Sequence, residues 1–353
     1  MIEIIPIEND GYWDEVVSTF PNHDIYYLSG YLKAFQAHGD GKPILFWYKD
    51  SHCQSVCVMF KRDVSNHFFF KNHLPNNVFF DMITPYGYGG FIFMGNVSSQ
   101  SLNSFKEEYN YFLRENNIIS SFTRYHPQLK NVDHIRSIFP IIDLGNTIDM
   151  PLGSLDEIWN NISSKNRNMI RKAQKSGVTI HHNDDKELLH QFKIMYNATM
   201  LKDNADEYYF FNDKFYDSIY HDLSNNFQVF YAFYENKLIS MSIFIYANNK
   251  MHYHLSGSEL SFRHLAPTNL LIYEAACWGH KQGFKTLHLG GGIGSGEDNL
   301  YKFKKAFNPF SRNQFSIGKN IVDNEKYMYL EELRRAHDTE FNQASSFFPV
   351  YRS

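Results

Sequence analysis

The sequence predicts an α+β (mixed α/β) protein of two lobes, each built on a mixed, largely antiparallel sheet flanked by helices. The first observation is length, because 353 residues exceed what one hydrophobic core usually serves. The second is a set of neighbouring strand patterns joined by short turns, which is typical of antiparallel hairpins. The third is order: in both halves of the chain a hairpin pattern is followed by a helix pattern and then by another strand.

Helix and strand periodicities define a first lobe, which we expect over residues 1–145. Ser98 is a natural N-cap for its longest helix, in which apolar residues recur at helical spacing. The predicted elements are, in order, a helix at 29–38, a hairpin at 42–60 with its turn at 49–51, a helix at 98–116, and strands at 118–125 and 138–144.

A second lobe is expected over residues 146–310, after a linker at 145–154 that contains Pro151 and Gly153. Pro267 fits the first turn of a helix, and Gly283 fits its end. The predicted elements are helices at 155–176 and 186–202, strands at 228–234, 238–247 and 250–256, a helix at 267–282 and a strand at 286–289. Asn248 and Asn249 predict a tight turn between the second and third of these strands.

Composition excludes several classes of protein. A net charge of −4 disfavours indiscriminate nucleic-acid binding, although it leaves room for one local basic patch. The sequence shows neither an apolar run of membrane-spanning length nor a secretory signal, so we expect a cytoplasmic protein. Three cysteines cannot form a disulfide framework, and buried thiols are favoured over a metal site. Aromatic residues make up 17% of the chain, which we assign mainly to the core and the surface.

A glycine-rich run, Gly290 to Gly296, follows the last predicted strand. It fails the dinucleotide pattern, because Ser295 and Glu297 occupy the positions that require the third glycine. It also fails the phosphate-loop pattern, because acids rather than Lys-Ser/Thr follow Gly296. Two readings remain: a strand end where a substrate can approach the main chain, or an ordinary glycine turn before an amphipathic helix.

Residues 164–175 form a second motif that carries basic residues and no acid. Arg167 and Arg171 lie four residues apart and therefore share one face of the predicted helix. This face suits a ligand rich in phosphate, and the alternative is a solvated helix face.

Asp81 precedes a third motif, the loop at 84–90, in which Tyr86 and Tyr88 alternate with glycines. Tyrosine rings beside glycines suit sugars, amides or bases, and a purely structural turn is an equal alternative.

The predicted strand at 250–256 carries the fourth motif. Strict alternation would place His252, His254 and Ser256 on one face and Tyr253 on the other. No third ligand stands at a matching spacing, so pocket-lining or structural histidines are favoured over a metal site, and we predict no metal.

Four segments in this order resemble the Fem family of peptidoglycan aminoacyltransferases and their relatives in the GNAT acyltransferase superfamily. They are residues 84–90, 164–177, 263–278, and 289–304, the last with its glycines, Asp298, Phe303 and Lys304. The resemblance covers about residues 25 to 310. It implies two tandem GNAT-like lobes with the substrate cleft between them, and a chain end, about 311–353, that returns to pack on the first lobe.

Fem-type enzymes move an aminoacyl group from aminoacyl-tRNA to an amine of a peptidoglycan precursor, whereas other members of the superfamily take acyl groups from acyl-CoA. The resemblance therefore implies an N-acyltransferase with acyl-CoA or aminoacyl-tRNA as co-substrate and no permanently bound cofactor. The implied acceptor is a phosphorylated, nucleotide-linked or lipid-linked amine, either a peptidoglycan peptide or an amino sugar of a surface polysaccharide. Transfer RNA would be a partner only as the carrier of the donor.

Acyl transfer to an amine needs a deprotonated nucleophile, a donor for the oxyanion and a proton source for the leaving group. We assign the first role to Asp81, the second to Lys304 or a backbone amide near Gly291, and the third to Tyr253 or Tyr86. The predicted substrate-binding residues are Tyr86, Tyr88, Arg167, Arg171, His254, Gly291, Gly292, Asp298 and Phe303, and the predicted donor-binding residues are Arg263, Ala266, Thr268 and Asn269.

The sequence departs from the family in two places. The pyrophosphate-loop pattern Arg-x-x-Gly-x-Gly/Ala appears only from Arg263 to Thr268, where Pro267 removes an amide donor but a helix N-terminus remains. The basic segment ends at Gly177, which leaves no room for the long helical arm of some Fem proteins. Two alternatives follow: a catalytically idle protein that binds a glycan or peptide, and a protein whose basic patch binds RNA.

Overall fold

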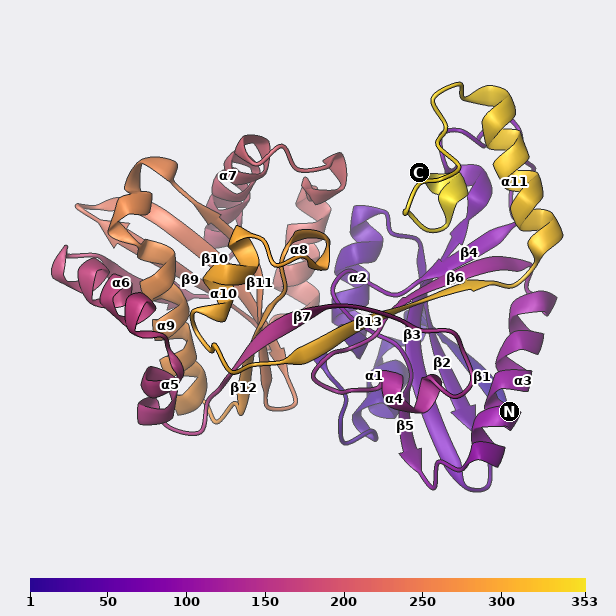
Figure 1. Cartoon of the computed structure of the whole chain (residues 1–353), viewed down its shortest axis with the longest axis horizontal. Helices are drawn as coiled ribbons and strands as arrows, with labels where there is room; N and C mark the ends of the chain where they lie inside the picture. The colour runs from indigo at the N-terminus through magenta and orange to yellow at the C-terminus, as the bar shows by residue number, and fades with distance from the viewer. The chain divides into compact units, whose positions relative to one another are not determined.

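The computed structural model describes all 353 residues, and the chain divides into two compact units (Figure 1). Unit 1 comprises Met1–Leu144 together with Phe315–Ser353, and unit 2 comprises Gly145–Gln314. Each unit is a mixed sheet with helices packed against it, so the predicted α+β class is confirmed. None of the helices combines the length and apolar character that a membrane span requires.

The sheet of unit 1 has the strand order β1-β2-β3-β4-β6-β13, and β5 pairs with β3. All of these pairs are antiparallel except β4 with β6, which is parallel. The strands are β1 (Ile2–Pro6), β2 (Lys42–Lys49), β3 (Cys53–Asp63), β4 (Phe80–Ile83), β5 (Ile92–Gly95), β6 (Ile118–Arg124) and β13 (Asn313–Ile321), and the helices are α1 (Asp10–Ser18), α2 (Ser29–His38), α3 (Ser99–Glu115), α4 (Val132–Ile135) and α11 (Asn324–His337).

Local signals explain the elements of unit 1 that were predicted. The Asp50 carboxylate accepts hydrogen bonds from the amides of His52 and Cys53, both at 2.6 Å, and closes the β2–β3 turn. The Ser98 side chain caps α3 by accepting from the amide of Ser101 at 3.1 Å. The three thiols of the chain, Cys53, Cys57 and Cys277, are free and buried, as expected.

The sheet of unit 2 has the order β7-β12-β11-β10-β9-β8, in which only β11 and β12 are parallel. The predicted turn at Asn248 and Asn249 is confirmed, because both residues have positive φ, as a tight hairpin turn requires. The strands are β7 (Ile142–Pro151), β8 (Thr179–Asn183), β9 (Phe227–Tyr234), β10 (Lys237–Ala247), β11 (Lys250–Ser258) and β12 (Thr286–Gly290), and the helices are α5 (Leu155–Asn161), α6 (Ser164–Lys175), α7 (Lys186–Lys202), α8 (Asp213–Asp222), α9 (Pro267–Lys281) and α10 (Asn299–Lys305).

The two units share one topology. From β1 to β6 in unit 1, apart from the short β5, and from β8 to β12 in unit 2, the chain forms a strand, two helices, three antiparallel strands, a crossover helix and a fifth strand parallel to the fourth. The crossover helices are α3 in unit 1 and α9 in unit 2. In each sheet a sixth strand is antiparallel to the fifth, and its place in the chain is unexpected: β7 follows β6 yet pairs with β12, whereas β13 follows β12 yet pairs with β6.

Three predicted elements are wrong in detail. The expected strand at 138–144 begins only at Ile142, where β7 starts. The expected linker at 145–154 is mostly strand, because β7 runs to Pro151 and its residues Ile148 to Pro151 pair with β12. The expected helix at 155–176 is two helices, because Ser154 and Ser163 each cap a separate one. The elements that the sequence patterns did not reveal are β1, α1, β4, β5, α4, β8, α8, β13 and α11.

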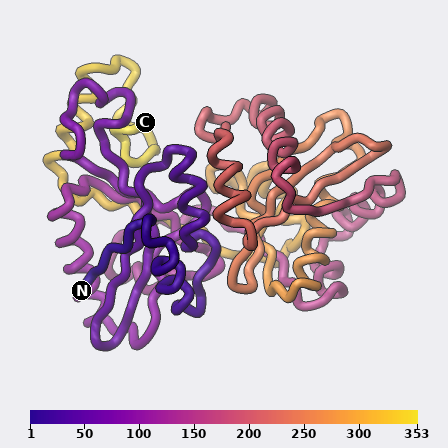
Figure 2. The backbone as a smooth tube through the Cα atoms, turned by 180° about the vertical axis from the view of Figure 1, so that it is seen from behind, coloured from indigo at the N-terminus to yellow at the C-terminus, as the bar shows by residue number.

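The C-terminal segment of unit 1 folds back beside α11 (Figures 1 and 2). Tyr327 and Leu330 of α11 share a buried cluster with Val350 and Tyr351. The Tyr327 hydroxyl accepts a hydrogen bond from the amide of Val350 at 2.9 Å. This packing holds the end of the described chain against the sheet.

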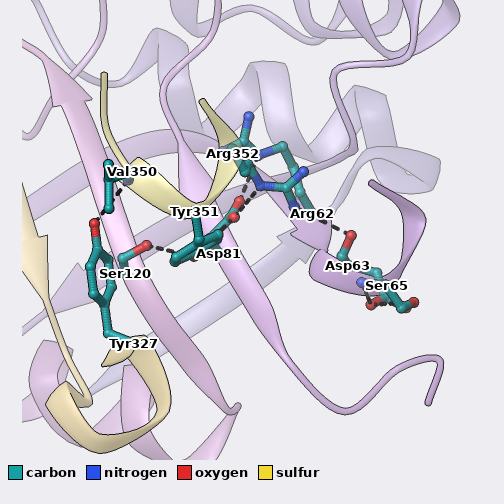
Figure 3. A network of polar contacts seen from close by, with 9 residues as sticks. All are labelled: Arg62, Asp63, Ser65, Asp81, Ser120, Tyr327, Val350, Tyr351 and Arg352. Atoms are coloured by element: carbon teal, nitrogen blue, oxygen red, sulfur yellow. Dashed lines mark hydrogen bonds and ion pairs between the residues drawn. The ribbon is translucent and has the colours of Figure 1, made fainter. Parts of the chain in front are cut away.

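Asp81 lies at the centre of a buried ionic network (Figure 3). It stands opposite Arg62 in the β3–β4 register, with Nε of Arg62 2.6 Å from Oδ1 of Asp81, and its second oxygen pairs with Arg352. The Tyr351 hydroxyl donates to the same carboxylate at 3.2 Å. Burial by itself would raise the pKa of Asp81, but Arg352 and Arg62 hold it below its ordinary value. The expectation that Asp81 deprotonates an amine therefore conflicts with its role as an internal counter-ion.

We predict that Asp81→Asn destabilises the protein by about 3–5 kcal/mol at pH 7, because it leaves two guanidinium groups without their anion. The lowered pKa means that the stabilisation is present above the unfolded value of about 3.9 and is lost as the pH falls through the folded value. Denaturant unfolding at neutral and acidic pH measures both effects. Asp10→Asn, which removes an exposed ion pair with Lys33, is the control, and an equal loss for both variants would contradict the prediction.

We also predict that Gly257→Ala destabilises unit 2 by about 1–3 kcal/mol, because the added methyl group would force the backbones of β11 and α7 apart. A Cβ on Gly257 would lie 2.9 Å from the carbonyl carbon of Met195 and from the amide nitrogen of Tyr196, so α7 must move away from β11. Gly11→Ala, which meets nothing within 4 Å on helix α1, should be neutral or stabilising. A calorimetric melt of each variant tests the contrast, and a neutral Gly257→Ala would refute it.

Candidate active site

The parallel pair β11–β12 brings two of the predicted motifs to one edge of the unit 2 sheet. The carboxyl ends of parallel strands meet at the same edge, so the segment after β11 and the glycine-rich segment after β12 both begin there. Pairing joins only Lys250–His252 with Thr286–His288, although β11 continues to Ser258. Beyond His252 this edge of β11 therefore has no strand neighbour, and further along the strand the amide of Ser258 donates to the Thr199 hydroxyl at 3.1 Å.

A β-bulge at His254 changes which side chains share a face of β11. Tyr253 pairs with Phe244 and Leu255 with Ile243, so His254 is an extra residue in the ladder. The expected alternation of His252, His254 and Ser256 on one face is therefore wrong. Burial lowers the pKa of His254 to about 3, with His252 adding to the effect, so the ring is neutral at physiological pH.

The bulge places Tyr253 with two serines. Ser242 Oγ donates to Ser256 Oγ at 2.9 Å, and hydrogen bonds with these two hydroxyls partly offset the effect of burial on Tyr253. Burial is the larger effect and raises the pKa of Tyr253, so its hydroxyl stays protonated at neutral pH. A protonated hydroxyl can act as a proton donor.

The predicted donor-binding residues lie at the start of α9, after a 3-10 turn at Leu260–Leu265. Ala266 has φ 57°, the left-handed conformation that usually requires glycine, and it holds the position of a glycine in the family pattern. No side chain caps α9, so the first backbone amides of this helix have no side-chain acceptor. Arg263, three residues before Ala266, is exposed. This arrangement suits an anionic group.

Two polar contacts hold the first turn of α9 in place. The Thr268 hydroxyl lies 3.1 Å from that of Ser240, and Asn269 donates to Asn166 Oδ1 at 2.6 Å. Asn269 therefore links α9 to α6, and neither side chain is freely directed at a ligand. Asn166 is buried, and its own amide nitrogen has no partner.

Lys304 lies at the glycine-rich end of β12. Its Nζ donates to the carbonyl of Gly291 at 2.7 Å, and the residue is only 9% exposed. Burial lowers the pKa of Lys304 to about 8, although the negative charge of Asp298 acts to raise it. A buried ammonium group with two further N–H groups is suited to stabilising negative charge on a ligand.

The other residues of this segment mainly shape it. The Asp298 carboxylate caps α10 by accepting from the amide of Tyr301 at 2.8 Å. A Cβ on Gly292 would lie 2.2 Å from the carbonyl of Gly296, so only glycine fits there. Phe303 packs on the hydrophobic core of unit 2 with Phe307, 5.5 Å between ring centroids. These contacts are structural, whereas Phe303 and Asp298 were expected to bind substrate.

The two arginines of the basic helix α6 have different environments. Nη1 of Arg167 donates to the carbonyls of Trp159, Asn160 and Ile162 at the end of α5, at distances of 3.3, 3.3 and 2.9 Å. Arg171 is exposed and stacks on Trp159, 5.0 Å from the ring centroid. Arg167 therefore offers a ligand only its remaining N–H groups, and Arg171 is the more accessible of the two.

The tyrosine loop at 84–90 belongs to unit 1 and is packed rather than free. The Tyr86 ring stacks on Phe35 at 5.5 Å, and its carbonyl accepts from the Tyr31 hydroxyl at 2.7 Å. Tyr88 packs edge-on against Tyr26 at 5.5 Å, and burial raises the pKa of Tyr88. With Asp81 held in the ionic network, the predicted site residues of unit 1 are largely engaged within that unit.

Sequence reasoning missed Tyr301, which lies in the first turn of α10. It is 2% exposed, and its hydroxyl has no hydrogen-bond partner. An unpartnered buried hydroxyl close in sequence to Lys304 is a candidate for contact with a ligand. The available signal was a tyrosine just after the cap residue Asp298.

Comparisons with known proteins agree with this geometry. Residues 161–305 match the family model described as "Acetyltransferase (GNAT) domain", a range that includes the β11–β12 edge and Lys304. A search of curated proteins finds no match.

Three solved structures have a similar fold. The crystal structure of FemX has a TM-score of 0.64 at 15% identity and covers 93% of this chain and 100% of its own. A conserved protein of unknown function from Bacteroides thetaiotaomicron has a TM-score of 0.58 at 8% identity, with 90% and 99% covered. The C-terminal domain of a protein assigned as a lysylphosphatidylglycerol synthetase, from Agrobacterium fabrum, has a TM-score of 0.53 at 10% identity, with 88% and 93% covered.

The identities are low, so these structures show the fold alone, and the family model is matched by residues 161–305. The resemblance inferred from the four sequence segments is confirmed at this level. Residues 161–305 resemble a GNAT domain in sequence, and the chain has a fold similar to that of FemX.

Proposed function

We propose that the protein is an N-acyltransferase or aminoacyltransferase that acts on the amine of a cell-envelope precursor, either a peptidoglycan peptide or an amino sugar of a surface polysaccharide. The observation that carries the proposal is the buried ammonium group of Lys304, bonded to Gly291 at the open β11–β12 edge of a GNAT domain. The fold shared with FemX supports the envelope precursor as the acceptor class.

Two of the three chemical roles, the oxyanion donor and the proton source, have a candidate within unit 2. Lys304 would donate to the oxyanion that develops as the amine attacks the acyl carbon. Tyr253, which is protonated at neutral pH, would return a proton to the leaving group. Asp81 is not retained as the base because two arginines hold its carboxylate.

The donor carries an anionic group in both versions of the reaction, acyl-CoA or aminoacyl-tRNA. The uncapped start of α9, with Ala266 in the left-handed conformation and Arg263 exposed, supports binding of that group there. The exposed cations of α6, Arg171 among them, would meet phosphates of the acceptor.

A second candidate is a protein that binds a glycan or peptide without turnover. It is favoured by one observation, that the predicted base Asp81 is engaged by Arg62 and Arg352. The variants described next distinguish the two, because only an enzyme loses turnover.

We predict that Lys304→Met lowers kcat by about 10²–10³-fold, the usual cost of losing one oxyanion donor, with a smaller effect on KM. Since the role needs the charged form, wild-type activity should fall as the pH rises above about 8, the pKa of Lys304. Lys304→Arg should move this fall in activity to higher pH. Initial rates of acyl transfer across pH measure both effects.

The control is Lys302→Met, which removes an exposed cation from the same helix. Equal turnover by the two methionine variants would remove Lys304 from the mechanism. Loss of turnover in Lys304→Met without a change in the melting temperature would separate catalysis from folding.

The donor is tested by thermal shift with acetyl-CoA, free CoA, UDP-sugars and a UDP-linked muropeptide. A ligand present at about 100 times its Kd stabilises the folded state by about 2.7 kcal/mol. If CoA is the donor, both CoA compounds should raise the melting temperature, and Arg263→Glu should reduce that rise. A rise with UDP compounds alone would exclude CoA and support aminoacyl-tRNA as the donor.

A further inference from the structure

The loop between β3 and β4, residues 64–79, lies beside the end of α11 at one extremity of unit 1 (Figures 1 and 2). It contains three consecutive phenylalanines, Phe68 to Phe70, followed directly by Lys71. No acidic residue occurs in it. The loop belongs to unit 1, so the proposed active site in unit 2 does not account for this composition.

The three phenylalanines have different environments. Phe70 is fully buried and shares a hydrophobic cluster with Tyr351. Phe69 stacks on the guanidinium group of Arg334, which lies 3.3 Å from the ring centroid. Phe68 is 72% exposed, and its ring centroid lies 3.7 Å from that of Phe69. Phe70 and Phe69 therefore fix the loop to the body of unit 1, and Phe68 is presented to solvent.

The loop is held at its base and again near α11. At the base, the amide of Val64 donates to the carbonyl of Phe79 at 2.9 Å. Further along the loop, the ring of His73 stacks on that of His337 at the end of α11, with 3.9 Å between the centroids. Phe68 thus stands on a fixed support, so little loop entropy is lost when it binds.

The surface near Phe68 carries a small excess of positive charge. Residues 64–79 and the adjoining end of α11 with its following turn, residues 333–341, contain three permanent cations, Lys71, Arg334 and Arg335. The same ranges contain two acids, Asp338 and Glu340. Asp338 is neutralised by Arg334, 3.0 Å away, whereas Lys71 and Arg335 are exposed. An exposed aromatic ring bordered by cations suits the boundary of an anionic lipid layer.

We propose that this loop docks unit 1 on an anionic lipid surface. Phe68 enters the boundary between headgroups and acyl chains, and Lys71 and Arg335 contact lipid phosphates. The contact lies on the bilayer and does not span it. The proposal does not depend on acyl transfer, so it holds whether or not the proposed function does.

The size of the apolar surface favours a bilayer over a protein partner. Phe68 is the one large hydrophobic side chain of residues 64–79 that is exposed, and residues 333–341 contribute none. A stable protein interface buries about 800 Å² on each partner and needs complementary shapes. A bilayer accepts a single ring without either requirement.

The test is co-sedimentation of the full chain with vesicles of phosphatidylcholine, alone or mixed equally with phosphatidylglycerol, up to millimolar lipid. We expect the mixed vesicles to bind at least about fivefold more tightly, the factor that one basic side chain contributes near an anionic surface. Raising the salt concentration should reduce this difference, because screening weakens the attraction. Equal binding to both vesicles, or no binding to either, overturns the proposal.

Variants connect the binding to the loop. Phe68→Ser should weaken binding to both vesicles about fivefold or more, because it removes the inserted ring. Lys71→Glu should weaken binding to the mixed vesicles alone. Tyr111→Ser is the control, because Tyr111 is 62% exposed on α3 of the same unit.

The melting temperatures of the three variants should match that of the wild type, because each changes an exposed side chain. Equal vesicle binding by Phe68→Ser and Tyr111→Ser refutes the proposal. Analytical ultracentrifugation tests a second copy of the chain as the partner. If Phe68→Ser abolishes self-association and leaves vesicle binding intact, the loop is a protein interface and the proposal is wrong.

Discussion

The parallel pairing of the fourth and fifth strands is the constraint on which each unit depends. A parallel pair cannot be closed by a short turn, so a crossover helix must return the chain to the same end of the sheet. In unit 2 this requirement places the start of α9 after β11 and the glycine segment after β12 at one edge. Because this pairing is only three residues long, the rest of β11 has no strand neighbour on that side. The position of Lys304 follows from this arrangement.

The two units use the same topology for different purposes. Ser98 caps the crossover helix α3 of unit 1, whereas no side chain caps α9 of unit 2. The fourth strand of unit 1 carries Asp81, which is neutralised by two arginines, whereas the fourth strand of unit 2 carries the bulge at His254. The equivalent strand of unit 1 therefore contributes to the stability of that unit, whereas in unit 2 the irregular strand and the uncapped helix lie beside the glycine segment.

An unsatisfied buried group lies beside the proposed active site of unit 2. The hydroxyl of Tyr301, near the glycine segment, is buried and has no hydrogen-bond partner. A stable core rarely tolerates such groups without a reason, since each costs free energy that hydrogen bonding would recover. Lys304 is a related case, because its single carbonyl partner leaves two N–H groups and burial disfavours its charge.

Local order could be read from the sequence, because caps, turns and periodicity act between residues that are close in the chain. Ser98, Asn248 and the glycine run were identified correctly for this reason, and the order of motifs indicated the GNAT-like fold. Only the tertiary structure decided which strands pair: β7 joins β12, and β13 returns to β6. It also decided that Asp81 meets Arg352, 271 residues away. Burial and strand pairing depend on residues that are distant in the chain. The type of a residue therefore determines which interactions its side chain can make, but not which partners lie next to it in the folded protein.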